Sequence, residues 1–118
     1  MRFHHAIIAA AGLCFLMPSG GHALDFSCDG RLTSSERTIC GSDELRRLDE
    51  HLARVYGRLW DAYGDRADAE RRRLELRDEQ RTFLSGRDAC GPSARCIARA
   101  YRGQIAMLSD RSRVAGLR

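Results

Sequence analysis

The chain has 118 residues, with 20 basic and 16 acidic side chains and a formal net charge of +4. That length leaves room for one domain only. Every basic residue is arginine, and the acidic residues are interspersed among them. The composition therefore indicates a surface of mixed charge and excludes a polybasic tail of the kind that binds nucleic acid or membranes.

The first 23 residues have the parts of a cleaved signal peptide. Arg2 supplies a positive charge, residues 6–17 form an apolar run, and a Pro-Ser-Gly-Gly break precedes a small-residue cleavage motif ending at Ala23. Such a run spans about 18 Å as a helix, short of the ~30 Å bilayer core, so we expect no permanent membrane anchor. Cys14 follows Leu13, not the small residue that lipidation needs, and is interpreted as part of the apolar run.

Cleavage leaves 95 residues with a net charge of +3 and four cysteines, Cys28, Cys40, Cys90 and Cys96. An even number in a short exported chain is typical of a disulfide framework in a periplasmic or secreted protein. Spacing alone does not decide among the three possible pairings. We favour the local pairs, Cys28 with Cys40 and Cys90 with Cys96, because both loops contain turn-forming residues. The alternative, a four-cysteine zinc site, usually has ligands about two to four residues apart, whereas the gaps here are eleven and five residues.

Two helices are predicted in the first half of the mature chain. Thr33 and Glu36 have capping-box spacing, and the helix they begin ends near Cys40, where a glycine follows. Ser42 is the predicted N-cap of a long helix that ends at Gly64. One face of this helix is apolar, because its large apolar residues recur every three or four positions. They are Leu45, Leu48, Leu52, Val55, Leu59 and Tyr63.

Two more helices are predicted in the second half. The third covers residues 66–85 and is strongly charged in its first half. Its thin apolar stripe consists of Leu74, Leu76, Phe83 and Leu84, with Gln80 on the same side. After a Gly-Pro break, Ser93 caps a fourth helix. That helix is expected to bury Ile97, Ala100, Tyr101, Ile105 and Leu108.

These patterns predict an all-α fold. No segment alternates as a strand would, and no internal repeat is visible. Short links between amphipathic helices imply antiparallel neighbours. We therefore predict a small antiparallel helical bundle or hairpin, stapled by two disulfides, over residues 24–108. Residues 109–118 are mostly polar, and we expect them to form a frayed tail.

The sequence offers little catalytic chemistry. His51 is the single histidine of the mature chain, and its spacing from Asp49 places the two on different helix faces. There is no lysine and no glycine-rich phosphate loop. Glu75, Asp78 and Glu79 alternate with arginines, as in salt bridges on a solvated helix face. We expect no catalytic residue, no metal, no cofactor and no nucleic-acid partner.

An ordered set of motifs runs along the mature chain. It reads Phe26-x-Cys28, Glu36-x-x-Ile39-Cys40, Leu48-Asp49-x-x-Leu52-x-x-x-Tyr56, Leu76-x-x-x-Gln80-x-x-Phe83-Leu84-x-x-Arg87-Asp88-x-Cys90, Cys96-Ile97 and Tyr101-x-x-x-Ile105-x-x-Leu108. This order resembles the N-terminal domain of LprI-type lysozyme inhibitors. The resemblance implies an exported helical domain and, from the family's name, inhibition of lysozyme. One departure is Phe83, where the family usually has tryptophan.

The resemblance leaves two interpretations of the polar motif residues. Gln80, Arg87 and Asp49 can be polar links between helices. Alternatively, the second cysteine loop carries a binding site whose candidate residues are Arg87, Asp88, Ser93, Arg95 and Gln80. The partner is then a lysozyme or a related peptidoglycan-cleaving enzyme; the competing hypothesis is an envelope module that binds another protein or a glycan. Animal-type lysozymes are basic, so long-range steering of a +3 domain towards them would be repulsive or neutral.

Overall fold

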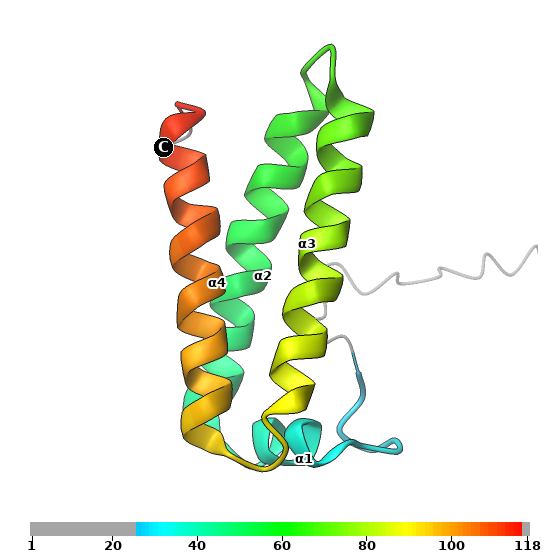
Figure 1. Cartoon of the computed structure of the whole chain (residues 1–118), viewed down its shortest axis with the longest axis vertical. Coiled ribbons are helices and arrows are strands. Elements are labelled where there is room, and N and C mark those ends of the chain that lie inside the picture. Colours follow the sequence, from blue (N-terminus) through cyan, green and yellow to red (C-terminus); the bar gives the residue numbers. More distant parts are fainter. Residues whose placement is uncertain (1–25, 117–118) are drawn as a thin grey trace, which may run out of the picture.

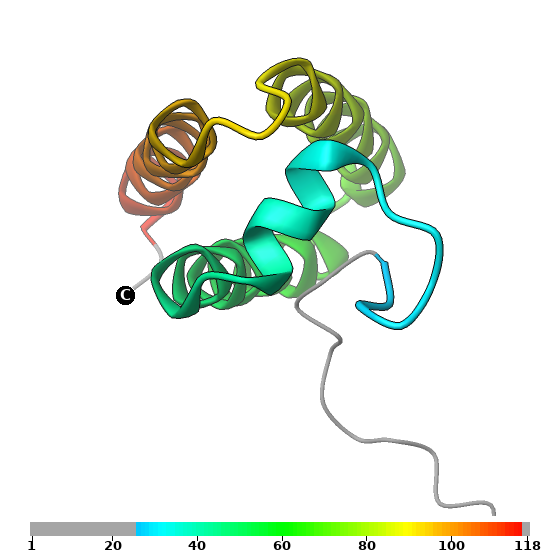
Figure 2. The ribbon, with the colours of Figure 1, turned by 90° about the horizontal axis from the view of Figure 1, so that it is seen from below.

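The computed structural model describes residues 26–116, and the predicted signal peptide lies outside this range. Three long helices stand side by side, and a short first helix crosses one end of them (Figures 1 and 2). None of the described helices has the length and apolar character needed to cross a membrane. In chain order the helices are α1 (Ser34–Cys40), α2 (Asp43–Gly64), α3 (Ala69–Ala89) and α4 (Ala94–Val114).

Hydroxyl groups begin three of the helices, as the sequence predicts. The Glu36 backbone N–H donates to Thr33 Oγ1 at 3.2 Å, and the Glu36 carboxylate accepts from the Thr33 N–H at 2.6 Å. This reciprocal pair confirms the capping box. Ser42 and Ser93 each accept a backbone N–H three residues later, at 3.2 Å. The starts of α2 and α4 are therefore fixed by local sequence.

The third helix differs from the prediction at both ends. Its N-cap, Asp68, makes no side-chain capping bond, because its carboxylate accepts from Arg71 and Arg72 at 3.0 and 2.8 Å. The helix starts at Ala69, not at residue 66, and continues past residue 85 to Ala89. Leu74 is 53% exposed, so its predicted place in the apolar stripe is wrong. Leu74 and Leu76 are two residues, or about 200°, apart around the helix, and only one of them can face the core.

The fourth helix is longer than predicted, because α4 continues to Val114 through most of the expected frayed tail. Arg111 explains the extension. Its two terminal nitrogens donate to the Glu79 carboxylate on α3 at 2.6 and 2.8 Å. A two-point contact of this kind fixes both side chains and ties the last turns of α4 to α3.

The core lies where the three long helices meet. Most of the apolar face predicted for α2 is buried, while Leu48 is only partly buried. On α4, Ala98 is buried and Ala100 is partly exposed. The buried apolar side chains are Ile39, Leu45, Leu52, Val55, Leu59, Tyr63, Leu76, Phe83, Ile97, Ala98, Tyr101, Ile105 and Leu108. The fold is therefore all-α with a single core, as predicted.

Both favoured disulfides are present. Cys28 bonds Cys40 with an S–S distance of 2.07 Å, and Cys90 bonds Cys96 at 2.03 Å. The first ties the segment before α1 to the end of that helix, and the second closes the α3–α4 connection. Because each sulfur is bonded to another sulfur, none of the four is a thiolate available for the zinc site considered as an alternative.

The short helix α1 contacts all three long helices and closes one end of the bundle (Figure 2). Its buried residue Ser35 lies within hydrogen-bonding distance of three carbonyl oxygens, those of Arg87, Asp88 and Gly91, at 3.2, 3.1 and 2.7 Å. Thr38 donates to the Pro92 carbonyl at 3.2 Å. The Arg87 and Asp88 carbonyls also accept backbone N–H groups at 3.1 Å, so the shortest Ser35 contact, to Gly91, together with that of Thr38, ties α1 to the segment that follows α3.

We expect Ser35→Ala to lower the free energy of unfolding by about 1–3 kcal/mol, because the part-buried Gly91 carbonyl loses its hydrogen-bond donor. Urea denaturation followed by circular dichroism measures this change. Ser85→Ala, at an exposed position of α3, is the control and should change stability by less than about 0.5 kcal/mol. Equal stability of the two variants would contradict this role of Ser35.

Candidate functional site

The Cys90–Cys96 loop lies at the same end of the bundle as α1 (Figure 1). Gly91 has φ +58°, a left-handed conformation that favours glycine, and it lets the chain turn directly after α3. The Ser93 hydroxyl is engaged in capping α4. Arg95 is exposed and forms no ion pair with any residue of the described segment. Among the predicted binding residues, Arg95 is therefore the one whose charge points outward without a partner.

Arg87 lies in the interior, with its side chain 1% exposed. Its Nε and Nη2 donate to Asp88 Oδ1 at 3.1 and 3.0 Å, and Nη1 donates to the Tyr101 hydroxyl at 3.4 Å. That hydroxyl donates in turn to Asp49 Oδ1 at 2.7 Å. The Phe26 ring centroid lies 5.4 Å from the guanidinium carbon. Arg87 therefore links helices and does not face an outside partner, contrary to the binding role considered for it.

The environment of this link also perturbs a tyrosine. Burial, together with the neighbouring Asp49 carboxylate, raises the pKa of the Tyr101 hydroxyl above its ordinary value of 10. The hydroxyl stays protonated, which it must be to donate to Asp49. Phe83 packs edge-on against the Tyr101 ring, with centroids 5.1 Å apart. The aromatic side chain is thus kept at the position where the resembling family usually has tryptophan.

The other two predicted binding residues lie apart. Asp88 is 38% exposed and holds Arg87 in place. Gln80 is half-buried on the core side of α3, and its Oε1 has no hydrogen-bond partner within residues 26–116. The structure therefore brings Arg87 and Asp88 together beside the Cys90–Cys96 loop but leaves Gln80 farther along α3.

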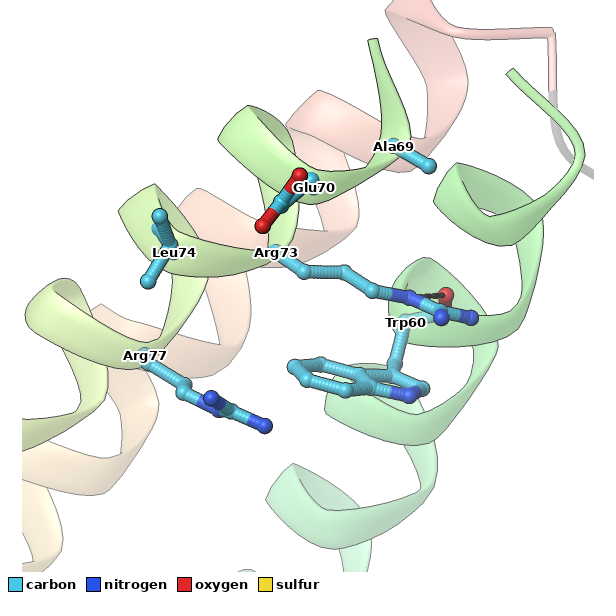
Figure 3. A pocket seen from close by; sticks show the side chains of 6 residues that line it. All are labelled: Trp60, Ala69, Glu70, Arg73, Leu74 and Arg77. Carbon is cyan, nitrogen blue, oxygen red and sulfur yellow. Dashed lines mark hydrogen bonds between the residues drawn. The ribbon is translucent and has the colours of Figure 1, made fainter. Parts of the chain in front are cut away.

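A groove between α2 and α3 is lined by residues that are not among the predicted binding residues. It lies towards the α2–α3 connection, at the end of the bundle opposite the Cys90–Cys96 loop (Figure 1). Its volume is about 380 Å³, and Figure 3 shows its side chains. The residues lining it are Trp60, Ala69, Glu70, Arg73, Leu74 and Arg77.

Trp60 lines this groove and is the only tryptophan in the chain. The guanidinium carbons of Arg73 and Arg77 lie 4.6 and 4.8 Å from its ring centroid, within cation–π distance. Arg73 is further fixed because its Nε donates to the Trp60 carbonyl at 2.9 Å. Tyr56, one turn earlier on α2, stacks on the indole at 6.2 Å. The α3 guanidinium groups are thus held on an aromatic surface.

The charge arrangement along α3 separates these two arginines from their neighbours. Arg71 pairs with Glu75 at 2.9 Å, and Arg81 pairs with Asp78 at 3.2 Å, as predicted for a solvated face. Arg73 and Arg77 make no ion pair within residues 26–116. One signal was visible in the sequence: no acidic residue stands three or four positions from Arg77, so the helix provides it with no carboxylate.

Comparison with known protein families gives one match. The model of the family described as "Lysozyme inhibitor LprI" matches residues 28–115, which is most of the chain. The chain belongs to the LprI family. Searches among curated proteins and among solved structures each gave no match.

The LprI match extends beyond the domain boundary expected from the sequence. It begins at Cys28, the first disulfide cysteine, and ends one residue after α4. The last turns of α4 therefore lie within the matched range. Membership in a family named for inhibition, together with two disulfides, fits a protein that works outside the cytoplasm. In the part of the chain that the structure describes, no three His, Cys, Asp or Glu side chains are grouped to hold a metal ion.

Proposed function

We propose that this protein is a periplasmic or secreted inhibitor that binds a lysozyme, or a related peptidoglycan-cleaving enzyme, and blocks its cleft without a covalent step. The observation that carries the proposal is the LprI match over residues 28–115. An inhibitor of this type performs no reaction of its own, so it needs a rigid and complementary surface in place of catalytic groups.

The Cys90–Cys96 loop is the surface we assign to the enzyme. A disulfide closes this loop, and the Ser35 hydroxyl of α1 fixes it further by donating to the Gly91 carbonyl at 2.7 Å. A loop that is fixed before binding loses little conformational entropy when the complex forms. Arg95 lies within this loop, in the first turn of α4, and is exposed.

The charge of Arg95 supports a role in recognition. Glycosidases of the lysozyme type use a pair of carboxyl groups at the bond they cleave, and a guanidinium group forms two-point hydrogen bonds with a carboxylate. The first turn of α4 carries no acidic residue, whereas a helix N-terminus favours negative charge. Arg99 follows one turn later and is also exposed, which adds like-charge repulsion. Arg95 and Arg99 are therefore unfavourable for the stability of α4, and their charges suit a contact with an acidic cleft.

We expect Arg95→Ala to raise the inhibitor concentration needed for half-inhibition by about tenfold or more, because the enzyme's carboxylate loses a buried charged partner. The measurement is clearing of a peptidoglycan suspension by several lysozyme classes, with the oxidised protein in excess. Arg54→Ala removes an exposed arginine from α2 and is the matched control.

The possible outcomes distinguish a failure of the proposed inhibition from a failure of the proposed binding surface. Unchanged lysozyme rates with the wild-type protein across all classes would defeat the proposal and favour an envelope module with another partner. Inhibition that is equally strong in the wild type and in Arg95→Ala would keep the function and reject this loop as the contact. A pull-down from envelope extract that yields a lysozyme would count in favour of inhibition.

A further inference from the structure

The groove around Trp60 combines aromatic, apolar and cationic side chains at the surface. Leu74 leaves 53% of its surface exposed at the rim, and two arginines lie beside the indole without acidic partners in the described segment. Tryptophan, tyrosine and arginine are the side chains that contribute most binding energy at recognition sites. One tryptophan and two arginines line this groove, which indicates a ligand with a negative charge and an apolar face.

The side chains that line the groove restrict the chemical class of that ligand. Arg73 and Arg77 provide guanidinium groups for a carboxylate, and Trp60 of α2 and Leu74 of α3 add apolar surface (Figure 3). The polarised C–H groups of a sugar ring are attracted to the negative face of an aromatic ring. Glu70 adds a hydrogen-bond acceptor, which suits hydroxyl and amide N–H donors and repels polyphosphates and nucleic acids. A volume of about 380 Å³ is at the small end of ligand pockets, sufficient for one or two sugar units.

We propose that the groove between α2 and α3 binds a carboxylate-bearing amino sugar, the chemistry of the peptidoglycan glycan strand, with Arg77 and Arg73 on the carboxylate and the sugar against Trp60. This site lies at the opposite end of the bundle from the Cys90–Cys96 loop (Figure 1). It does not depend on lysozyme inhibition. A protein carrying both sites would be held on the polymer that the target enzyme attacks.

The single tryptophan makes the test direct, because the protein has one indole N–H signal in a ¹H–¹⁵N correlation spectrum. The oxidised protein is titrated with N-acetylmuramic acid, with N-acetylglucosamine and with lactate. The first sugar is the second one plus a lactyl ether, so the three probes separate the carboxylate from the ring. We expect saturable movement of the indole signal with N-acetylmuramic acid, and affinities at least about tenfold weaker for the other two probes.

Arg77→Gln removes the charge and keeps a polar, hydrogen-bonding side chain. We expect it to weaken N-acetylmuramic acid binding about tenfold, as for loss of one charge-assisted hydrogen bond. Arg81→Gln, one turn later on α3 and paired with Asp78, is the matched control and should bind as the wild type does. Both residues are exposed, and the remaining signals of the spectrum report whether each variant is folded.

Four results would overturn the proposal. They are no response to N-acetylmuramic acid, equal affinity for N-acetylglucosamine, equal affinity for lactate, and unchanged binding by Arg77→Gln. An indole shift with a short acidic peptide but with neither sugar would instead assign the groove to a protein partner. None of these measurements uses lysozyme, so they leave the inhibition assay as a separate test.

Discussion

Replacing Arg87 by methionine is expected to lower the free energy of unfolding by about 3–5 kcal/mol, among the largest effects of any single substitution in this protein. The side chain is 1% exposed, and its guanidinium group donates to the Tyr101 hydroxyl that in turn holds Asp49. Methionine fills much of the space but donates no hydrogen bond. The variant therefore leaves Asp49, itself only 5% exposed, buried next to a tyrosine that has lost part of its support.

Urea denaturation of the oxidised protein measures this loss, and a double-mutant cycle shows its origin. Asp49→Leu alone should also be destabilising, because the buried Tyr101 hydroxyl loses its acceptor and the Arg87 charge keeps only the partly exposed Asp88 carboxylate. The double variant Arg87→Met with Asp49→Leu should cost less than the sum of the two, since both charged groups are then gone. Arg81→Met, on the exposed side of α3, is the control. Strict additivity of the two core substitutions would show that the residues act independently.

Removing both disulfides is the second large change, and we expect it to lower stability by about 5 kcal/mol in total. For loops of 12 and 6 residues, restriction of the unfolded chain contributes about 3 and about 2 kcal/mol. Domains of this size have a total stability of only about 5–15 kcal/mol. The doubly deficient protein should therefore be close to unfolding at 37 °C.

Paired substitutions to alanine separate the two bonds. Cys28 and Cys40 replaced together should shift the urea midpoint more than Cys90 and Cys96 replaced together, because the first loop is longer. Loss of the Cys90–Cys96 bond should in addition weaken inhibition, since it frees the loop that contains Arg95. Oxidised and reduced wild-type protein unfolding at the same urea concentration would contradict the structural role of both bonds.

The sequence determined the features of this protein that depend on near neighbours in the chain. The Thr33–Glu36 capping box, the Ser42 and Ser93 caps and the apolar face of α2 were all predictable. The two disulfides belong to the same class, because each joins cysteines within a short loop of turn-forming residues. Local hydrogen bonds and helical periodicity decide such features, and both can be read without knowing the fold.

The sequence placed Leu76, Phe83 and Gln80 on one side of α3, and the tertiary structure decided that Arg87 shares this face and Leu74 does not. Leu76, Gln80, Phe83 and Arg87 recur every three or four residues on that helix and face the core. Two of the four are polar, so apolar periodicity marks this face only weakly and does not include Arg87. Arg87 became an interior residue because its guanidinium group pairs with the adjacent Asp88 and donates to Tyr101 of α4, which in turn donates to Asp49 of α2.

The same reason applies to the groove around Trp60 and to the end of α4. The groove exists because α3 lays Arg73 and Arg77 against Trp60 of α2, and the end of α4 is ordered by Glu79 of α3. A local sequence pattern fixes where a helix starts and stops. Contacts between different helices fix which of its charges are exposed, and those contacts depend on the packing of the whole bundle.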